Sequence, residues 1–429
     1  MRVVIVGGGA AGVCVAGFLR RPNLYGAPST MEVLLLEKGD APLRKLRATG
    51  NGRCNFTNTH VSPDHYTGGT ADQTAPALSR FTFREAVDFF SFLGIPHITL
   101  ESGMTYPATL RADTVADRLM EWIKDAGVSV RTGCSVETLR RQEKCFVLTL
   151  ASGEKIMADA VLLATGGSYG IAKKEWSNGY TLAKKLGHRL TRLHPGIVPL
   201  AVHDSARTTA LSGIKLKAKI TAQTTCITDD VLFTTYGLSG TGILRVSNRV
   251  LDALNDGRIT SSRREKSDND RNTVELLLNL LPDRREEEWF AYLHGLAARF
   301  PTWPVKALFS GILPAKVVDR LLLECGMDEK SEASEESWTR VLRRALAWPF
   351  TITGAHKNDH GQVTCGGVDT AQWNSRTMES LCCPGLYLIG EVLDIQGECG
   401  GYNLHWAWAS ARAAAEALEK SARRKSGCV

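Results

Sequence analysis

The chain has 429 residues, 43% of them hydrophobic and 23% charged, and a formal net charge of +7 at pH 7. These proportions are typical of a globular protein with a large core and exclude an intrinsically disordered chain. No apolar run reaches the ~18 residues of a membrane-spanning helix. A strand pattern starts at residue 3 and leaves no room for a leader sequence, so we expect a cytoplasmic protein without membrane contact.

Cysteine and histidine spacing gives no sign of a metal centre. The eleven cysteines form no C-x-x-C pair, and Cys382 and Cys383 are adjacent. The ten histidines show no H-E-x-x-H spacing. We therefore predict reduced thiols and no bound metal.

The first dozen residues have the pattern of a strand, a tight turn and a helix. Residues 3–6 form a β-branched run typical of a strand buried on both faces, and an apolar helix is predicted over residues 10–19. Glycines at G-x-G-x-x-G spacing allow the turn, the approach of a pyrophosphate and close packing of helix on strand. The alternative is a glycine turn without a ligand. The predicted contacts are Gly7, Gly9, Ala10, Ala11 and Gly12.

A second strand, residues 32–36, ends at Glu37, which is placed to accept a hydrogen bond from a ribose hydroxyl. After Lys38, residues 43–58 are rich in Gly, Asn, Thr and Arg and are predicted to be a loop that lines a ligand with polar groups. The alternative is a glycine-rich surface loop. The candidate contacts are Lys38, Lys45, Thr49, Gly50, Asn51, Gly52, Arg53, Cys54 and Asn55.

The next segment is predicted to return to the first sheet. Helices are expected over residues 83–93 and 114–126, and strands over 128–131, 146–150 and 154–157, with a hairpin turn at 152–153. Val136, just before the hairpin, is a candidate adenine contact. A second buried strand, residues 160–164, runs into a glycine-containing turn where the backbone can approach a cofactor closely. The candidates there are Ala164, Thr165, Gly166 and Gly167.

The middle of the chain changes character twice. Residues 190–258 are β-rich, with turns expected at 195–196, 212–213 and 229–230, and residues 261–272 are predicted to be a mobile charged loop. Residues 272–346 have helical spacing, with Leu276, Leu277 and Leu280 among the core positions, and residues 350–356 resemble a last strand. The predicted segments are a nucleotide-binding domain at 1–189 and 347–429, a β-rich domain at 190–258 and a helical domain at 259–346.

The C-terminal part is predicted to complete the cofactor site. A strand over residues 386–389 leads into Gly390, Glu391 and Asp394, and glycines precede a long helix over residues 406–423. A glycine turn at a helix N-terminus stabilises negative charge at the pyrimidine edge of a flavin, so FAD rather than NAD is the predicted resident cofactor. The alternative is an apolar helix that merely begins at glycine. The candidates at this turn are Gly400, Gly401, Tyr402, Asn403 and Leu404.

Positive charge is concentrated in residues 184–219. This segment contains eight Lys or Arg residues and one acid, Asp204. Lys215, Lys217 and Lys219 alternate with apolar residues, so a strand would place all three on one face. They are either a solvated edge strand or a surface for a polyanion such as RNA.

Three sequence blocks are similar to one family. The blocks are GGGAAG with RKLRATGNGRCNFTN, then VLFTTYGLSGTGIL, then VTCGGVDTAQW together with GLYLIGEVLDIQGECGGYNLHWAWASA. The chain resembles the BaiN/RdsA family of FAD-dependent oxidoreductases over nearly its whole length. The resemblance implies an α/β fold, in which a doubly wound, Rossmann-like FAD-binding domain is interrupted by a β-barrel-like domain and a helical domain. Thr241 stands where the family often has proline, and His405 where it often has glutamine.

The resemblance also implies a reaction. Family members include rRNA dihydrouridine synthases, reductases of unsaturated steroid rings and aminoacetone oxidases. The leading hypothesis is an FAD-dependent reductase that uses NAD(P)H as a transient reductant and acts on uridine in ribosomal RNA. A small-molecule flavin oxidase or ene-reductase, and a non-catalytic FAD-stabilised RNA-binding protein, are the alternatives. The candidate proton donors are Cys54, Cys399, Tyr402 and His405.

Overall fold

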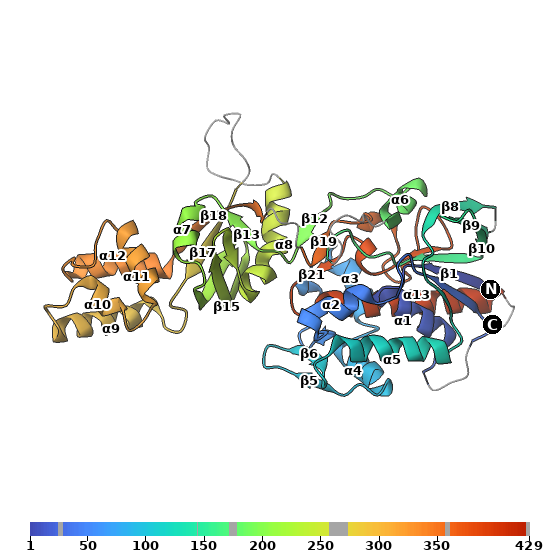
Figure 1. Cartoon of the computed structure of the whole chain (residues 1–429), viewed down its shortest axis with the longest axis horizontal. Helices are drawn as coiled ribbons and strands as arrows, with labels where there is room; N and C mark the ends of the chain where they lie inside the picture. Colours follow the sequence, from blue (N-terminus) through green and yellow to red (C-terminus); the bar gives the residue numbers. More distant parts are fainter. Residues whose placement is uncertain (25–28, 144, 171–177, 257–272, 357–360, 426–429) are drawn as a thin grey trace, which may run out of the picture. The chain divides into compact units, whose positions relative to one another are not determined.

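The chain divides into two compact units, which are Met1–Gly196 with His360–Val429, and Ile197–Asp359. The computed structural model describes residues 1–24, 29–143, 145–170, 178–256, 273–356 and 361–425 (Figure 1). The predicted loop at 261–272 and the predicted boundary between residues 258 and 259 lie outside these ranges. No helix in the described ranges is long and apolar enough to span a bilayer.

The first unit is organised around a five-stranded sheet in which every neighbouring pair is parallel. Its spatial order is β20 (Leu386–Leu388), β11 (Ala160–Leu163), β1 (Arg2–Val6), β2 (Glu32–Leu36) and β7 (Ser129–Arg131). The central strand β1 is buried because its β-branched side chains contact neighbours on both faces. The predicted Rossmann-like α/β fold is confirmed.

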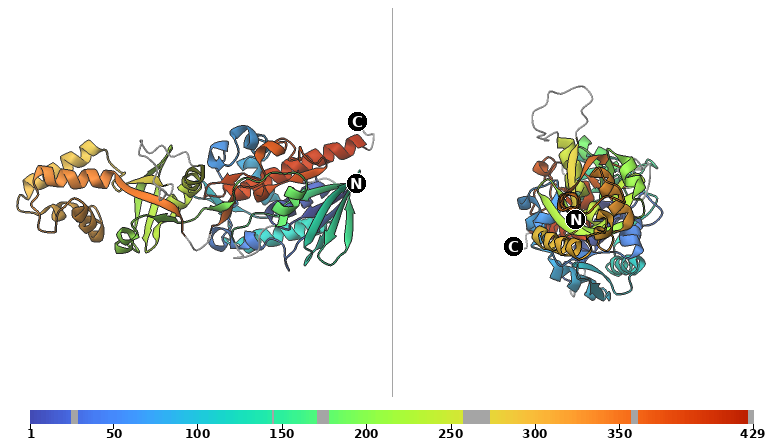
Figure 2. Two further views of the ribbon diagram at one scale, coloured as in Figure 1. Left: turned by 90° about the horizontal axis from the view of Figure 1, so that it is seen from above. Right: turned by 90° about the vertical axis from the view of Figure 1, so that its left-hand side faces the viewer.

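Helices cover this sheet and bring both ends of the chain together. The C-terminal helix α13 (Tyr402–Lys425) packs along α1 (Ala10–Arg20), which also contacts α5 (Ala112–Asp125) (Figures 1 and 2). Phe18, Phe89 and Trp122 pack together in tilted and edge-to-face arrangements, with ring centroids 5.1–5.4 Å apart. Both termini of the chain therefore contribute to one hydrophobic core.

Smaller elements complete the first unit. An antiparallel sheet contains β10 (Lys155–Ala158), β9 (Cys145–Leu150) and β8 (Val136–Gln142). Short pairings join β3 (Thr57–Asn58) to β6 (Met104–Pro107) and β5 (His97–Thr99), β4 (Tyr66–Thr67) to β21 (Gln396–Gly397), and β12 (His194–Gly196) to β19 (Val363–Cys365). The remaining helices are α2 (Arg44–Gly52), α3 (Ala71–Leu78), α4 (Phe83–Phe92), α6 (Asn178–Lys185) and the 3-10 turns η1 (Pro63–His65), η2 (Thr370–Gln372) and η3 (Gly390–Val392).

The second unit contains a closed six-stranded barrel. Its order is β13 (Leu200–Val202), β16 (Gly237–Ser239), β15 (Thr225–Thr234), β14 (Lys215–Ala222), β17 (Val274–Asn279) and β18 (Trp348–Ala355). Helices α7 (Ser205–Ala210) and α8 (Thr241–Asp256) pack on it. Between β17 and β18 the chain forms α9 (Glu286–Arg299), α10 (Val305–Phe309), α11 (Ala315–Glu324) and α12 (Glu335–Leu346) (Figure 1).

Three elements predicted in the middle of the chain are wrong. The segment around Leu276 and Leu277 is strand β17 rather than helix, and Val274, Leu276 and Leu278 alternate into the barrel core. The expected turn at 229–230 lies within β15, where Asp229 accepts hydrogen bonds from Thr241 Oγ1 and Arg245 Nη1 at 2.6 and 3.0 Å. The expected turn at 195–196 belongs to β12, which pairs with β19.

A buried ion pair joins α7, which packs on the barrel, to α11 in the helical segment between β17 and β18. Arg207 Nε lies 2.7 Å from Glu324 Oε1, and only 11% and 16% of their side chains are exposed. The guanidinium lies over the rings of Trp348 and Phe350, 4.7 and 4.1 Å from their centroids. Glu324 also accepts the indole N–H of Trp348 and a bond from Arg320 Nε, both at 2.9 Å. Burial lowers the pKa of Arg207. The carboxylate of Glu324 compensates the positive charge of the buried guanidinium.

Candidate functional site

The glycine turn between β1 and α1 leaves one open position. Gly7 has φ +109° and a Cβ there would lie 2.4 Å from the carbonyl oxygen of Ala164, while a Cβ on Gly12 would lie 1.9 Å from that of Gly7. A Cβ on Gly9 meets no protein atom within 4 Å. Gly9 is the N-cap of α1, and no side chain caps the helix there. The structure thus offers an uncapped helix N-terminus facing free space, which suits a pyrophosphate.

Glu37 is held beside this turn by backbone amides. Its Oε2 accepts a hydrogen bond from Gly8 N and its Oε1 one from Gly39 N, both at 2.7 Å. Two donors fix the carboxylate at the end of β2 and leave lone pairs for a ribose hydroxyl. The exposed Lys38 follows it.

The segment predicted as a loop at 43–58 begins as a helix. Arg47 ties α2 to α5 through Asp113 and Asp117, at 2.7 and 2.8 Å, and the pKa of Asp113 is lowered by its hydrogen bond with Arg47. The helix is broken from Thr49 to Asn51, where Gly50 and Asn51 have left-handed backbone angles. The polar end of this segment is therefore a turn rather than an open loop. Gly52 and Arg53 follow on the exposed side of the turn.

A network that the sequence did not reveal lies behind the predicted glycine turn at 166–167. Lys45 Nζ lies 2.6 Å from Glu391 Oε2 and donates to the carbonyl of Tyr169 at 3.1 Å. Glu391 Oε1 accepts from Thr364 N at 2.8 Å, and Thr364 Oγ1 accepts from Ser168 N at 2.7 Å. Lys45 and Glu391 were predicted as cofactor contacts, and the structure brings them together although 346 positions separate them.

The glycines before α13 lie against the 55–58 segment. Gly401 has φ +98°, and a Cβ there would lie 2.6 and 2.7 Å from Thr57 O and Asn55 Oδ1. Asn58 Nδ2 donates to Gly400 O at 2.9 Å. Two sequence blocks, one near each end of the chain, thereby build one surface at the N-terminus of α13.

Three other predicted cofactor contacts make hydrogen bonds within the protein. Asn403 bonds both backbone groups of Gly397, at 2.9 and 2.7 Å, and so holds the turn before α13. The side chain of Val136 is buried, and its carbonyl accepts from Asn178 Nδ2 at 2.6 Å. Asp394 is 7% exposed, and its Oδ1 accepts from Gln396 Nε2 at 3.2 Å. Their contact with a cofactor stays a prediction.

Two of the predicted proton donors are enclosed. Burial raises the pKa of Cys54 to about 12, so its thiol is neutral. His405 has no exposed surface, and its ring nitrogens contact Thr57 Oγ1 at 2.8 Å and Phe81 O at 2.7 Å. Because a carbonyl only accepts, Nε2 carries the proton and Nδ1 accepts from Thr57. Tyr402 is buried under the ring of His65, and Cys399 is half-buried.

His405 makes the stability of the protein depend on pH. Burial lowers the pKa of His405 from 6.5 to about 4, so the unfolded chain binds this proton first on acidification. The stabilisation linked to the neutral form of His405 is complete above pH 6.5 and is lost as the pH falls towards 4. We expect the free energy of unfolding to fall by up to ~1.4 kcal/mol per pH unit across this window. Urea unfolding at pH 7 and pH 5 measures it.

The control for this expectation is a pair of variants. His405→Gln removes the titrating group and should reduce the pH dependence, whereas His97→Gln, at an exposed position, should leave it unchanged. An equal pH dependence of stability in the wild type and His405→Gln would contradict the assignment of this dependence to His405.

The comparisons with known proteins agree with this architecture. A family model described as "HI0933-like protein Rossmann domain" matches residues 1–417. The chain belongs to this family. It is 31% identical over 97% of its length to a 3-dehydro-bile acid delta(4,6)-reductase of Clostridium scindens, 99% of which is covered. It is 30% identical over 97% of its length to the ribosomal RNA dihydrouridine synthases of Escherichia coli and Haemophilus influenzae, covering 97% and 98% of them. The resemblance inferred from the sequence blocks is confirmed.

The basic region of this HI0933-like protein is not one surface element. Residues 184–192 belong to the first unit and residues 207–219 to the second. Arg207 is buried against Glu324. Lys215, Lys217 and Lys219 are exposed on one side of β14, as the alternation predicts, but β14 pairs with both β15 and β17. β14 is therefore not an edge strand from Lys219 onward, where β17 pairs with it, whereas Lys215 and Lys217 lie where β15 is its partner.

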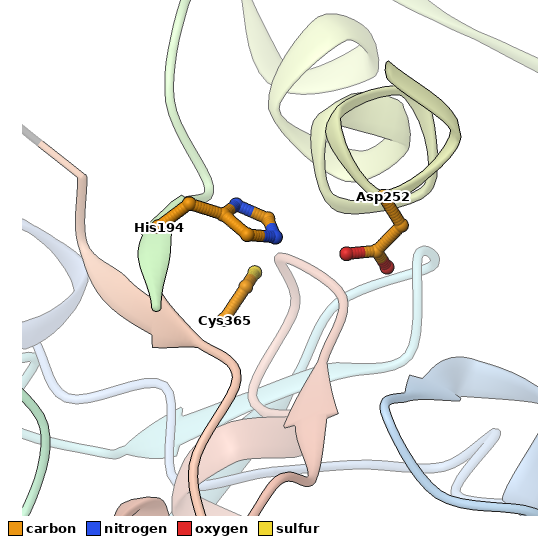
Figure 3. Close-up of side chains that lie close together, drawn as sticks. All are labelled: His194, Asp252 and Cys365. Atoms are coloured by element: carbon orange, nitrogen blue, oxygen red, sulfur yellow. The ribbon is translucent and has the colours of Figure 1, made fainter. Parts of the chain in front are cut away.

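One histidine and one cysteine side chain lie close together in the first unit. His194 on β12 is the register partner of Cys365 on β19, and Figure 3 shows their side chains together. Asp252, also drawn there, is on α8 of the second unit. The 171 positions between His194 and Cys365 explain why no spacing motif indicated this pairing.

Proposed function

We propose that this protein binds FAD and uses it to reduce a C=C bond conjugated to a carbonyl, with uridine in ribosomal RNA as the substrate. The observation that carries the proposal is the open position at Gly9, beside an uncapped helix N-terminus and an immobilised Glu37. Free space, backbone donors and a carboxylate at the ends of adjacent parallel strands suit the pyrophosphate and ribose of a dinucleotide.

Each part of the site would hold one part of FAD. The turn from Gly7 to Gly12 would hold the pyrophosphate, and Glu37 the ribose of the adenosine. The 49–55 turn, the 164–167 turn, Glu391 and Asp394 would surround the centre of the molecule. The turn from Gly400 to Leu404 would present the positive end of α13 to the flavin ring. A bound flavin supplies hydride transfer, and NAD(P)H would dock transiently because the sequence holds no second G-x-G-x-x-G.

The names of the relatives support a shared chemistry. One relative is named as a reductase of a bile acid and two as synthases of dihydrouridine in ribosomal RNA. Both names describe saturation of a ring C=C bond. In uracil, C5=C6 is conjugated to the C4 carbonyl, which makes it an acceptor for hydride. A base in RNA must leave its stack to reach an enclosed flavin.

The exposed lysines of β14 are the proposed contact with RNA phosphates. Lys215 is paired with Asp230 at 2.6 Å, and the pKa of Lys215 is raised by that hydrogen bond. Lys217 and Lys219 are therefore the better candidates. We expect Lys217→Glu with Lys219→Glu to weaken RNA binding and to reduce the slope of log Kd against log salt by about 2. Filter binding between low and moderate salt measures both.

Lys316→Glu with Lys330→Glu is the matched control, because it makes the same charge change at exposed positions of the same unit. Equal losses in the two double variants would assign the effect to net charge. An unchanged salt slope in the first would return these lysines to ordinary solvated surface.

The function itself is tested by mass spectrometry of ribosomal RNA nucleosides from cells with and without the gene. We expect a dihydrouridine signal that disappears on deletion and returns with the wild-type gene, but not with Gly9→Val. An unchanged signal would favour the second candidate, a small-molecule ene-reductase or oxidase, which the bile-acid reductase relative supports. Restoration by a Gly9→Val protein that carries no flavin would instead indicate an RNA-binding role without flavin chemistry.

A further inference from the structure

A histidine and a glutamate form a pair beside the proposed flavin site. His65 ends η1 and Glu398 follows β21, and the pairing of β4 with β21 brings them together across 333 positions. His65 Nδ1 lies 3.3 Å from Glu398 Oε2. Backbone contact supports the side chains, because Glu398 N donates to His65 O at 2.9 Å.

The histidine ring is also fixed from its face. It stacks on the ring of Tyr402 with centroids 4.4 Å apart and planes 14° from parallel. Tyr402 is the first residue of α13, and the hydroxyl of Tyr66 donates to its carbonyl at 3.0 Å. The same turn carries Gly400 and Gly401, so the pair sits on the segment proposed to face the flavin ring. His65 is therefore held in one orientation by a carboxylate and an aromatic face.

We propose that His65, oriented by Glu398 and Tyr402, is the general acid of the reduction. This inference rests on the proposed function, which supplies a hydride to one carbon of the C=C bond. The electron pair of the former π bond then takes a proton at the neighbouring carbon. In the imidazolium form Nδ1–H faces Glu398, which leaves the Nε2 proton for transfer. The ring becomes neutral, and water returns the proton.

Exposure distinguishes His65 from the enclosed donors. The His65 side chain is 26% exposed, so solvent reaches it, whereas 11% of Glu398 is exposed. Cys54 and His405 have no exposed surface. The other titratable groups on the elements around His65 are Asp64 on η1, Asp72 on α3, which packs against η1, and the phenols of Tyr66 and Tyr402. Glu398 makes the direct contact with the Nδ1 of His65.

The test separates the two half-reactions in the FAD-loaded protein. With NADPH alone, we expect His65→Gln to load FAD and to be reduced within about twofold of the wild-type rate. With unmodified ribosomal RNA added to the reduced protein, we expect dihydrouridine to form at least ~100-fold more slowly, the range of a lost general acid. His97→Gln should match the wild type in both steps.

A second measurement needs no turnover. The Nδ1 proton of His65 in isotope-labelled protein, assigned by its loss in His65→Gln, is observed by NMR. We expect Glu398→Gln to move this proton signal upfield, because Nδ1–H loses its carboxylate acceptor. Asp64→Asn should leave the signal in place.

The outcomes are distinguishable. Wild-type protein that takes up no flavin or forms no dihydrouridine would overturn the proposed function, and the inference with it. Wild-type turnover that is undiminished in His65→Gln would overturn the inference alone. An Nδ1 proton signal unmoved by Glu398→Gln would show that the two groups do not act together.

Discussion

A Gly9→Val variant is expected to fold and to lose its flavin. Gly9 has φ −77° and ψ −172°, extended angles that valine adopts readily, and a Cβ there meets no protein atom within 4 Å. The added side chain would occupy the space proposed for the pyrophosphate and block its approach to the amides of α1. Loss of two hydrogen bonds to a charged group is worth about 3 kcal/mol or more, so affinity for FAD should fall at least ~100-fold.

The measurement is the visible flavin absorbance of the purified protein, with circular dichroism to confirm folding. Gly12→Val provides the contrast, because its Cβ would lie 1.9 Å from the carbonyl oxygen of Gly7 and should prevent folding. Gly295→Val, in α9 with no atom near its Cβ, should keep its flavin. A folded Gly9→Val protein with a full complement of flavin would contradict the site.

Glu324→Gln is expected to destabilise the second unit by about 3 kcal/mol, because the buried Arg207 loses its ion-pair partner. Glutamine keeps the size of the side chain and one acceptor oxygen, so packing changes little. The stacking of the guanidinium on Trp348 and Phe350 remains in the variant. Urea unfolding followed by tryptophan fluorescence reports the change.

The matched control is Glu336→Gln in the same helical segment. Glu336 pairs with Arg340 at 2.8 Å, but 83% of its side chain is exposed, so we expect a loss below about 0.5 kcal/mol. Equal losses at the two positions would show that the Arg207 pair is no stronger than a surface pair.

Local patterns predicted the first unit well. Strand β2 and the start of α1 lie where the sequence placed them, because a β-branched run, glycine spacing and an apolar helix agree there. The barrel was harder to predict. Leu276, Leu277 and Leu280 have helical spacing, and only pairing with the distant strands β14 and β18 makes Val274–Asn279 a strand. Asp229 and Asp230 suggest a turn, but Thr241 and Arg245 on α8 satisfy Asp229 within a strand.

The site shows the same division between local and distant information. Glycine turns and Glu37 follow from short spacings, and the structure places them at adjoining strand ends. The contacts of Lys45 with Glu391 and of His65 with Glu398 join residues that lie more than 300 positions apart. A single sequence holds no signal for such pairs. Burial of Cys54 and His405 was equally invisible, because it depends on α13 packing over the 55–58 segment.

The points at which the chain leaves and re-enters the first unit are themselves paired. Gly196 is the register partner of Val363 within that unit, and Leu200 is the partner of Ala355 within the barrel. While the barrel is folded, it holds the two ends of the inserted segment close together. Only a short loop then has to be closed in the first unit. If the barrel unfolds, the first unit must close a loop as long as Ile197–Asp359, at an entropic cost of about 2–3 kcal/mol. Folding of the barrel thus supports the cofactor-binding unit through chain entropy alone.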